Sequence, residues 1–76
     1  MPDALHQRIA DDLRARIDSG RLAPGGKLES QRELAAEYAR DLSRPVSVSV
    51  IRAAVAILIG EGLIEIRKGR GTFAPA

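Results

Sequence analysis

Lys68-Gly69-Arg70-Gly71 is the segment whose residue types most clearly suggest a chemical role. Two cations alternate with two glycines, and the glycines allow the positive φ angles of a tight turn. Because cations on a turn cannot be buried, their charges face solvent and are available to the phosphates of a polyanion. Exposed cations are also common on turns that bind nothing. The segment therefore predicts either a phosphate-binding tip or a solvated turn.

The residues on both sides of this turn predict a β-hairpin. Ile64 and Ile66 alternate with Glu65 and Arg67, as in a half-buried strand, and Phe73 lies on the returning strand. An apolar segment with the length of a helix comes directly before the hairpin. A hairpin with a basic tip after an apolar helix is the layout of a winged helix-turn-helix, in which the wing touches DNA.

Three helices are predicted before the hairpin. The first has apolar residues at every fourth position from Leu5 to Ile17, with Asp3 as its expected N-cap and Gly20 as the residue that ends it. The connection that follows is rich in turn residues and has room for a very short strand near Lys27–Glu29.

The second helix is expected to begin with a capping box. In Ser30-Gln31-Arg32-Glu33 the serine hydroxyl can accept from the glutamate amide while the glutamate side chain reaches back to the serine amide. The helix should run to about Leu42, with Ser43-Arg44-Pro45 as the turn after it. The residues expected on its buried side are Leu34, Ala35 and Tyr38.

The third helix has two possible starts and two possible ends. Ser47 or Ser49 caps it, and Gly60 or Gly62 terminates it. Its outer face carries small residues around one long side chain, Arg52. The residues expected in its buried stripe are Ile51, Ala54, Val55, Leu58 and Ile59.

The composition limits the class of protein. The chain has 76 residues and no cysteine, and its 12 Lys and Arg against 10 Asp and Glu give a net charge of +2. We expect residues 1–76 to form one α+β domain, a winged helix-turn-helix without disulfides. The longest apolar run, 53–59, is too short to span a bilayer, and the N-terminus does not resemble a signal peptide. A cytoplasmic location is therefore expected.

The distribution of charge is more informative than the total. Most acidic residues lie in the first 41 positions, whereas residues 67–70 contain three cations. Such a charge dipole would turn the C-terminal half toward a polyanion. No combination of nucleophile and base, no carboxylate pair and no cluster of metal ligands suggests catalysis. The sequence predicts no enzymatic activity, no cofactor and no metal.

Several segments occur along the chain in an order that is known from one protein family. They are Ser19-Gly20-Arg21-Leu22-Ala23-Pro24-Gly25, Lys27-Leu28, Ser30-Gln31-Arg32-Glu33-Leu34-Ala35, Arg52-Ala53-Ala54-Val55, Glu61-Gly62-Leu63 and Gly69-Arg70-Gly71-Thr72-Phe73. With these segments at near-family spacing, nearly the whole chain resembles the DNA-binding domain of GntR-type bacterial transcription regulators. The resemblance implies a recognition helix in the major groove of DNA and a wing in the adjacent minor groove.

The chain departs from the family pattern at two places. Glu29 stands where the family usually has a proline, and Ala39–Pro45 replaces a much shorter turn between the second and third helices. In the register that we prefer, the recognition helix is entered through Val46–Arg52, and Val48 stands where the family has an arginine. A rival register draws Ser43-Arg44-Pro45 into a longer third helix, but proline is disfavoured inside a helix.

The resemblance assigns DNA contacts to the second and third helices. Arg32 lies in the first turn of its helix, where a cation opposes the helix dipole, so a role on DNA is favoured over a structural one. Arg52 is expected to contact a base or a phosphate, although a surface ion pair would also explain it. Ser47 and Ser49 are expected near phosphate at the helix start, and one of them is also the N-cap.

Two further groups complete the predicted DNA-binding residues. Lys68, Gly69 and Arg70 form the tip of the wing, where the glycine permits close approach to the minor groove. Arg40 and Arg44 belong to the inserted segment and could supply the phosphate contacts that Val48 cannot make. A solvated loop pointing away from DNA is an almost equally favoured interpretation of the insertion.

The sequence thus predicts a sequence-specific double-stranded-DNA-binding domain of a transcription regulator, with repressor favoured over activator. The expected partner is a palindromic operator bound by two copies of the chain, with no membrane partner. The domain is either part of a longer regulator or a small regulator by itself. A protein-docking module of the same fold is the alternative, and binding to single strands is disfavoured because exposed aromatic residues are few.

Overall fold

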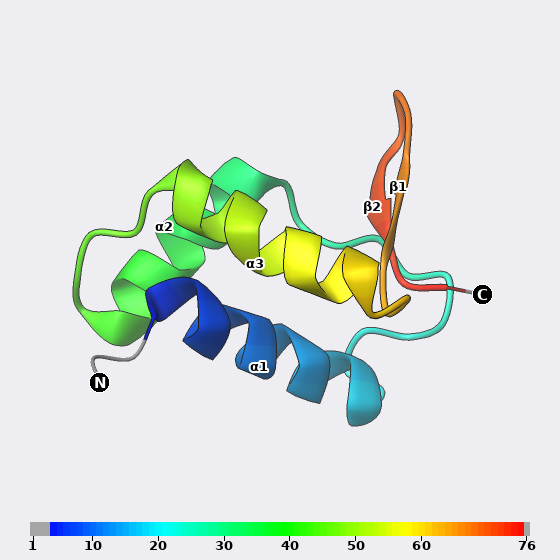
Figure 1. Cartoon of the computed structure of the whole chain (residues 1–76), viewed down its shortest axis with the longest axis horizontal. Coiled ribbons are helices and arrows are strands. Elements are labelled where there is room, and N and C mark those ends of the chain that lie inside the picture. The colour runs from blue at the N-terminus through cyan, green and yellow to red at the C-terminus, as the bar shows by residue number, and fades with distance from the viewer. Residues whose placement is uncertain (1–3, 76) are drawn as a thin grey trace.

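The computed structural model describes residues 4–75, which form three helices and a two-stranded antiparallel hairpin (Figure 1). Helices α1 and α3 run side by side, and the hairpin projects away from the helices beyond the end of α3 (Figure 1). The expected α+β winged helix-turn-helix is therefore confirmed. The elements are α1 (Leu5–Asp18), α2 (Gln31–Leu42), α3 (Val48–Gly60), β1 (Glu65–Arg67) and β2 (Gly71–Phe73).

The first helix ends as its sequence predicts. Ser19 is the C-cap of α1, and Gly20 follows it with a φ of 81°, as expected for a residue at the C′ position. At the other end Ala4 occupies the N-cap position and makes no side-chain cap. The N-cap predicted at Asp3 lies outside the described residues.

The capping box of α2 is confirmed. Ser30 Oγ accepts a hydrogen bond from the Glu33 amide at 3.1 Å, and Glu33 Oε1 accepts one from the Ser30 amide at 3.1 Å. The bonds that the carboxylate receives from Ser30 hold the pKa of Glu33 below its usual value. The helix ends at Leu42 as predicted, where Ser43 takes a left-handed conformation and begins the turn.

The start of α3 decides between the alternatives that the sequence left open. Ser47 is the N-cap, because its Oγ accepts from the Val50 amide at 3.2 Å. The helix therefore begins after Pro45, which rules out the register that placed Ser43-Arg44-Pro45 in a longer third helix. At the C-terminal end the helix includes Gly60, and Gly62 has the positive φ of a C′ residue.

The core lies between the three helices, and its largest fully buried side chains are Ile9, Leu13, Leu34, Ile51 and Leu58. Two predicted core positions are wrong. Ile59 is 38% exposed, because it follows Leu58 around the helix by about 100° and lies at the edge of the buried stripe. Ile66 is 60% exposed although Ile64 on the same face is only 3% exposed.

The difference between Ile64 and Ile66 arises from the length of the hairpin. Alternation places both side chains on one face of the strand, but the hairpin extends beyond the helices, so the buried core reaches only the residue at its base (Figure 1). Of the two aromatic residues of the chain, Tyr38 is buried as expected, and Phe73 on the returning strand is only half-buried. The guanidinium of Arg67 lies over the Phe73 ring, with its Cζ atom 4.6 Å from the ring centroid.

Part of the connection between α1 and α2 pairs with strand β2 of the hairpin. Lys27 forms an antiparallel bridge with Phe73, which confirms the very short strand expected near Lys27–Glu29. The Leu28 amide donates to the Thr72 carbonyl at 2.8 Å, and the Ala74 amide donates to the Gly26 carbonyl at 2.9 Å. These bonds fix the segment before α2 to the base of the wing.

Candidate nucleic-acid interface

One side of the molecule brings together segments that are far apart in the sequence. In Figure 1 the first turns of α2 and α3 lie along the upper edge, the wing projects upward, and α1 lies on the opposite side. The wing and the two helix starts therefore face in the same general direction. This is the side on which most of the predicted DNA-binding residues are found.

Ion pairs divide the cations of the chain into two groups. Arg14 pairs with Asp11 and Glu61, Arg16 pairs with carboxylates of α1, α2 and the connection between them, and Arg67 pairs with Glu65. The other cations enter no ion pair in the part of the chain that the structure describes. They include Arg32, Arg52, Lys68 and Arg70 at the helix starts and the wing tip, and also Arg8 and Arg21 in the region of α1. Their positive charge is available to an external polyanion.

Arg32 occupies the first turn of α2, directly after the capping box. Its side chain is exposed, and a cation at this end of a helix is opposed by the helix dipole. Glu33 supplies the favourable negative charge of this turn. The capping box fixes the start of α2 and so fixes the position of the Arg32 backbone. The Arg32 charge does not stabilise this helix start.

The first two turns of α3 present a face made of small residues and one arginine. Ser49 and Arg52 are both exposed and are three positions apart, so they lie on the same side of the helix. Ser47 Oγ accepts the cap hydrogen bond, and its hydroxyl hydrogen remains a possible donor to a phosphate. A helix with a narrow, polar face of this type suits the major groove of DNA.

The wing tip is a tight turn closed by a hydrogen bond from the Arg70 amide to the Arg67 carbonyl at 2.8 Å. Lys68, Gly69 and Arg70 are exposed, and Gly69 has a φ of 76°. Arg67 differs from its basic neighbours, because it bonds to Glu65 at 2.9 Å and covers Phe73. The tip therefore carries two available cations, and the third cation of the cluster stabilises the hairpin.

A groove of about 780 Å³ separates the wing from the segment that leads into α2. Residues 66–72 form one wall, and residues 27–31 with Glu33 form the other. Lys27 was absent from the DNA-binding residues that the sequence predicted, yet its exposed side chain lies at this groove. Lys27 belongs to the very short strand that the sequence predicted, but only the chain path shows that this residue pairs with β2 of the wing.

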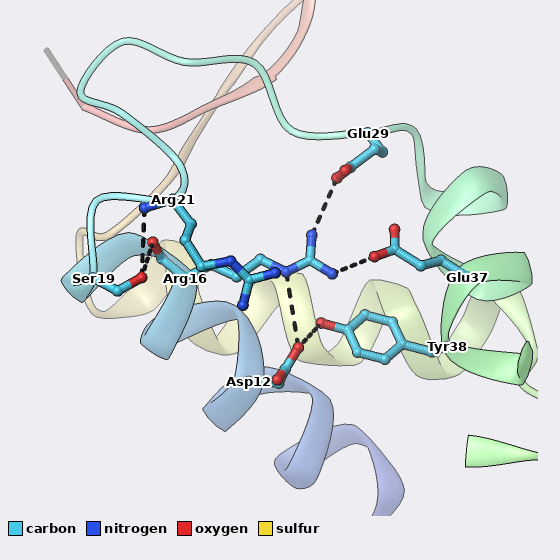
Figure 2. A network of polar contacts seen from close by, with 7 residues as sticks. All are labelled: Asp12, Arg16, Ser19, Arg21, Glu29, Glu37 and Tyr38. Atoms are coloured by element: carbon cyan, nitrogen blue, oxygen red, sulfur yellow. Dashed lines mark hydrogen bonds and ion pairs between the residues drawn. The ribbon is translucent and has the colours of Figure 1, made fainter. Parts of the chain in front are cut away.

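A network around Arg16 holds the connection and α2 against α1 (Figure 2). Its guanidinium lies 2.6 Å from a Glu37 carboxylate oxygen and 3.5 Å from one of Glu29, and the side chain is only 11% exposed. Tyr38 donates a hydrogen bond to Asp12. Glu29, at the family's usual proline position, thus ties the segment before α2 to α1.

Two members of this network, Tyr38 and Arg16, keep their protons over the physiological range. Burial and the hydrogen bond to Asp12 raise the pKa of Tyr38, so its hydroxyl stays protonated. Burial lowers the pKa of Arg16, but the facing oxygens of Tyr38, Glu37 and Glu29 outweigh this effect and raise it. The network is a constant structural support for the start of α2.

The inserted segment lies at the end of the molecule away from the wing (Figure 1). Arg40, in the last turn of α2, and Arg44, in the turn after it, are both exposed. The Arg44 amide donates to the Ala39 carbonyl at 3.2 Å, which fixes the path of the turn toward α3. The structure therefore places one cation at the end of α2 and the other in the turn before α3, and both lie far from the wing (Figure 1).

The described residues contain no group of three or more His, Cys, Asp or Glu side chains that could hold a metal ion. None of the helices between residues 4 and 75 has the length and apolar character needed to cross a membrane.

Comparisons with known proteins agree with this geometry. The model of the family described as bacterial regulatory proteins, gntR family, matches residues 5–74. The Exu regulon transcriptional regulator of Escherichia coli strain K12 is 40% identical over 70 residues, which are 92% of this chain and 25% of that protein. The HTH-type transcriptional repressor NagR of Bacillus subtilis strain 168 is 35% identical over 72 residues, 95% of this chain and 27% of the repressor. The chain thus spans about a quarter of the length of these relatives.

Solved structures give the same result. The DNA-binding domain of AraR in complex with operator ORR3 superposes with a TM-score of 0.80 at 26% identity, covering 92% of this chain and 77% of that one. YtrA from Sulfolobus acidocaldarius, a GntR-family transcription factor, has a TM-score of 0.77 at 32% identity and covers 93% of this chain and 68% of its own.

Proposed function

The chain belongs to the gntR family of bacterial regulatory proteins, and from this membership we infer that it binds double-stranded DNA as part of a transcription regulator. Residues 1–76 act as one winged helix-turn-helix domain that recognises a specific operator. The observation that carries the proposal is the group of cations on the side of the wing and the helix starts, which no ion pair between described residues neutralises. The operator complex of the AraR domain supports it.

In the docking arrangement that we propose, α3 enters the major groove and the wing lies in the adjacent minor groove. Arg52 then faces the base edges, while Ser47, Ser49 and Arg32 approach phosphates near the starts of their helices. Lys68 and Arg70 contact the backbone on both sides of the minor groove, and Gly69 lets the turn approach closely. Arg40 and Arg44 contact backbone phosphates near the start of α3.

The test of DNA binding is the dependence of affinity on salt. A domain that uses about four to six phosphate contacts should show a slope of log affinity against log salt of about −4 to −5. Fluorescence anisotropy would be measured on a duplex obtained by selection from genomic fragments, with a scrambled duplex as control. Absence of binding to any duplex at low salt, or a flat slope, would contradict the proposal.

The regulator acts as a repressor, as its relative NagR is named, and two copies bind a palindromic operator. The apolar stripe of α1 is consumed by the core, so the isolated chain is expected to be mainly a monomer that pairs on DNA. Sedimentation of the chain at tens of micromolar, with and without a palindromic duplex, checks this. A stable dimer without DNA would reveal an interface on the helices. Such a regulator works in the cytoplasm, at the nucleoid.

A protein-docking role without DNA contact is the second candidate function. It would be favoured by apolar side chains on the exposed face of α3. The first part of that face carries Ser49, Arg52 and Ala56, and its exposed isoleucine, Ile59, lies in the last turn of the helix. The described residues give no support for catalysis. The relatives of the chain named above are transcription regulators. We therefore propose that the domain is not an enzyme and acts through binding alone.

A further inference from the structure

Lys27 contacts the wing in the folded chain, although this residue lies about forty positions before the wing in the sequence. Its alkyl chain crosses Gly71 so closely that a Cβ added there would lie 2.9 Å from Lys27 Cε and 3.7 Å from Nζ. Gly71 has a φ of 125°, which only glycine adopts easily. The absence of a side chain at position 71 therefore lets Lys27 lie flat against the wing, with its ammonium group at the groove between the wing and α2.

The geometry of duplex DNA gives this groove an occupant. A major groove and its neighbouring minor groove are separated by a single sugar-phosphate strand. If α3 occupies the major groove and the wing occupies the minor groove, the sugar-phosphate strand between these two DNA grooves must pass between the helices and the wing. The groove of about 780 Å³ between residues 66–72 and residues 27–31 with Glu33 is the space that lies there.

We propose that Lys27 binds a phosphate of the strand that separates the two DNA grooves. This proposal rests on the proposed DNA-binding function and adds a contact from the connection before α2 to those of the helices and the wing. Lys27 is exposed and makes no ion pair with any other described residue. Its charge is thus available, and it joins those of Lys68 and Arg70 on the same groove.

Neither carboxylate of the groove forms an ion pair with Lys27, although the Lys27 charge is one of the smaller causes that lower the pKa of Glu33. Glu33 turns its carboxylate back to the Ser30 amide, from which it accepts a hydrogen bond at 3.1 Å. Glu29 lies 3.5 Å from the guanidinium of Arg16, on the side of α1 (Figure 2). Both acids are therefore engaged with other groups of the chain, whereas the ammonium group of Lys27 is not.

The experiment separates the charge of Lys27 from the packing of its alkyl chain. Lys27→Met keeps a chain that reaches the Cε position over Gly71 and removes only the ammonium group, whereas Lys27→Arg keeps a charge there. Arg8→Met is the matched control, because it removes one exposed cation from α1 on the opposite side of the molecule. Affinity for the selected duplex and for a scrambled duplex is measured by anisotropy across salt, and folding is checked by thermal unfolding.

Loss of one phosphate contact should make the salt slope of Lys27→Met shallower by about 0.9 and weaken binding up to about tenfold near 0.1 M salt. Both duplexes should be affected equally, because a phosphate carries no sequence information. Lys27→Arg should bind like the parent chain, and Arg8→Met should change the slope little. The melting temperature should be the same in all three variants.

Two results would overturn the proposal while leaving the proposed function intact. One is a Lys27→Met chain that binds with the parent slope. The other is an equal loss of slope in Arg8→Met, which would mean that net charge matters and position does not. Failure of the parent chain itself to bind any duplex is a different result, because it would remove the DNA-binding function on which the proposal rests.

Discussion

The three-helix core and the wing are built by different rules, although they adjoin each other in the chain. In the core, apolar side chains such as Leu13, Leu34 and Leu58 are almost completely buried, and Arg14 and Arg16 join the helices through ion pairs. In the wing, all three residues of β1 are exposed, and Ile66 packs against no core. The core is specified by burial, whereas the wing is specified by turn geometry and charge. Substitutions in the two regions should therefore fail in different ways.

The largest expected effect compares equal losses of apolar volume in the two regions. Leu58→Ala should lower the free energy of unfolding by about 2–5 kcal/mol, because it opens a cavity at a completely buried site. Ile66→Ala should change it by less than about 0.5 kcal/mol, since the side chain is mostly exposed. Urea unfolding followed by circular dichroism measures both. A comparable loss in Ile66→Ala would mean that the wing shares the core.

The next effect distinguishes specificity from affinity on the DNA-binding face. Arg52→Ala should weaken binding to the preferred duplex by about 1–3 kcal/mol and narrow its advantage over scrambled DNA. Replacing Lys68 and Arg70 together by alanine should weaken binding to both duplexes to a similar extent, because we propose that the wing contacts mainly phosphates. Competition anisotropy gives both affinities. If the wing variant alone lost sequence preference, the two roles would be reversed.

A smaller effect is expected at the inserted segment, which lies far from the wing. Arg40→Ala with Arg44→Ala should make the salt slope shallower by about one to two units if both cations contact phosphates. Arg8→Ala with Arg21→Ala is the matched control, since it removes the same charge from the region of α1. Circular dichroism checks that both variants fold. Parent-like binding in the first variant would make the insertion a spacer and leave Arg52 to carry the contacts of α3.

The smallest effect concerns stability at acid pH. Hydrogen bonds from Arg14 hold the pKa values of Glu61 and Asp11 below their usual values, and those from Ser30 do the same for Glu33. A carboxylate whose pKa is depressed in the folded state stabilises the fold above its unfolded pKa, and this contribution is lost as the pH falls through the folded value. The melting temperature should therefore fall as the pH drops below about 4.

One ion pair from each region allows the stability of the core and that of the wing to be compared at acid pH. Glu61→Gln should reduce this pH dependence, because it removes one partner of the link between α1 and the end of α3. Glu65→Gln, which breaks an ion pair within the wing, should leave the melting curve nearly unchanged. An equal response of the two variants would show that the hairpin unfolds together with the helices.

Much of the fold follows from local sequence patterns. The capping box at Ser30, the end of α2 at Leu42 and the basic turn at Gly69 were all predicted, because each depends on residues within a few positions of one another. Similarly, the exposure of Arg32, Arg52, Lys68 and Arg70 follows from periodicity and turn chemistry. Their contacts with DNA stay predictions, which the substitutions of Arg52 and of the wing tip test.

Only the tertiary structure decided which groups of one type share a role. In the sequence Arg67 and Arg70 are similar cations. In the fold Arg67 contacts Glu65 and Phe73, whereas Arg70 lies at the wing tip without an ion pair to any described residue. The fold places Lys27 against Gly71 and exposes Ile66 while burying Ile64. Local propensities act over one or two turns of chain, whereas these outcomes depend on where distant segments pass. The sequence alone thus determined the elements and their charges, and the chain path determined which charges remain available to a ligand.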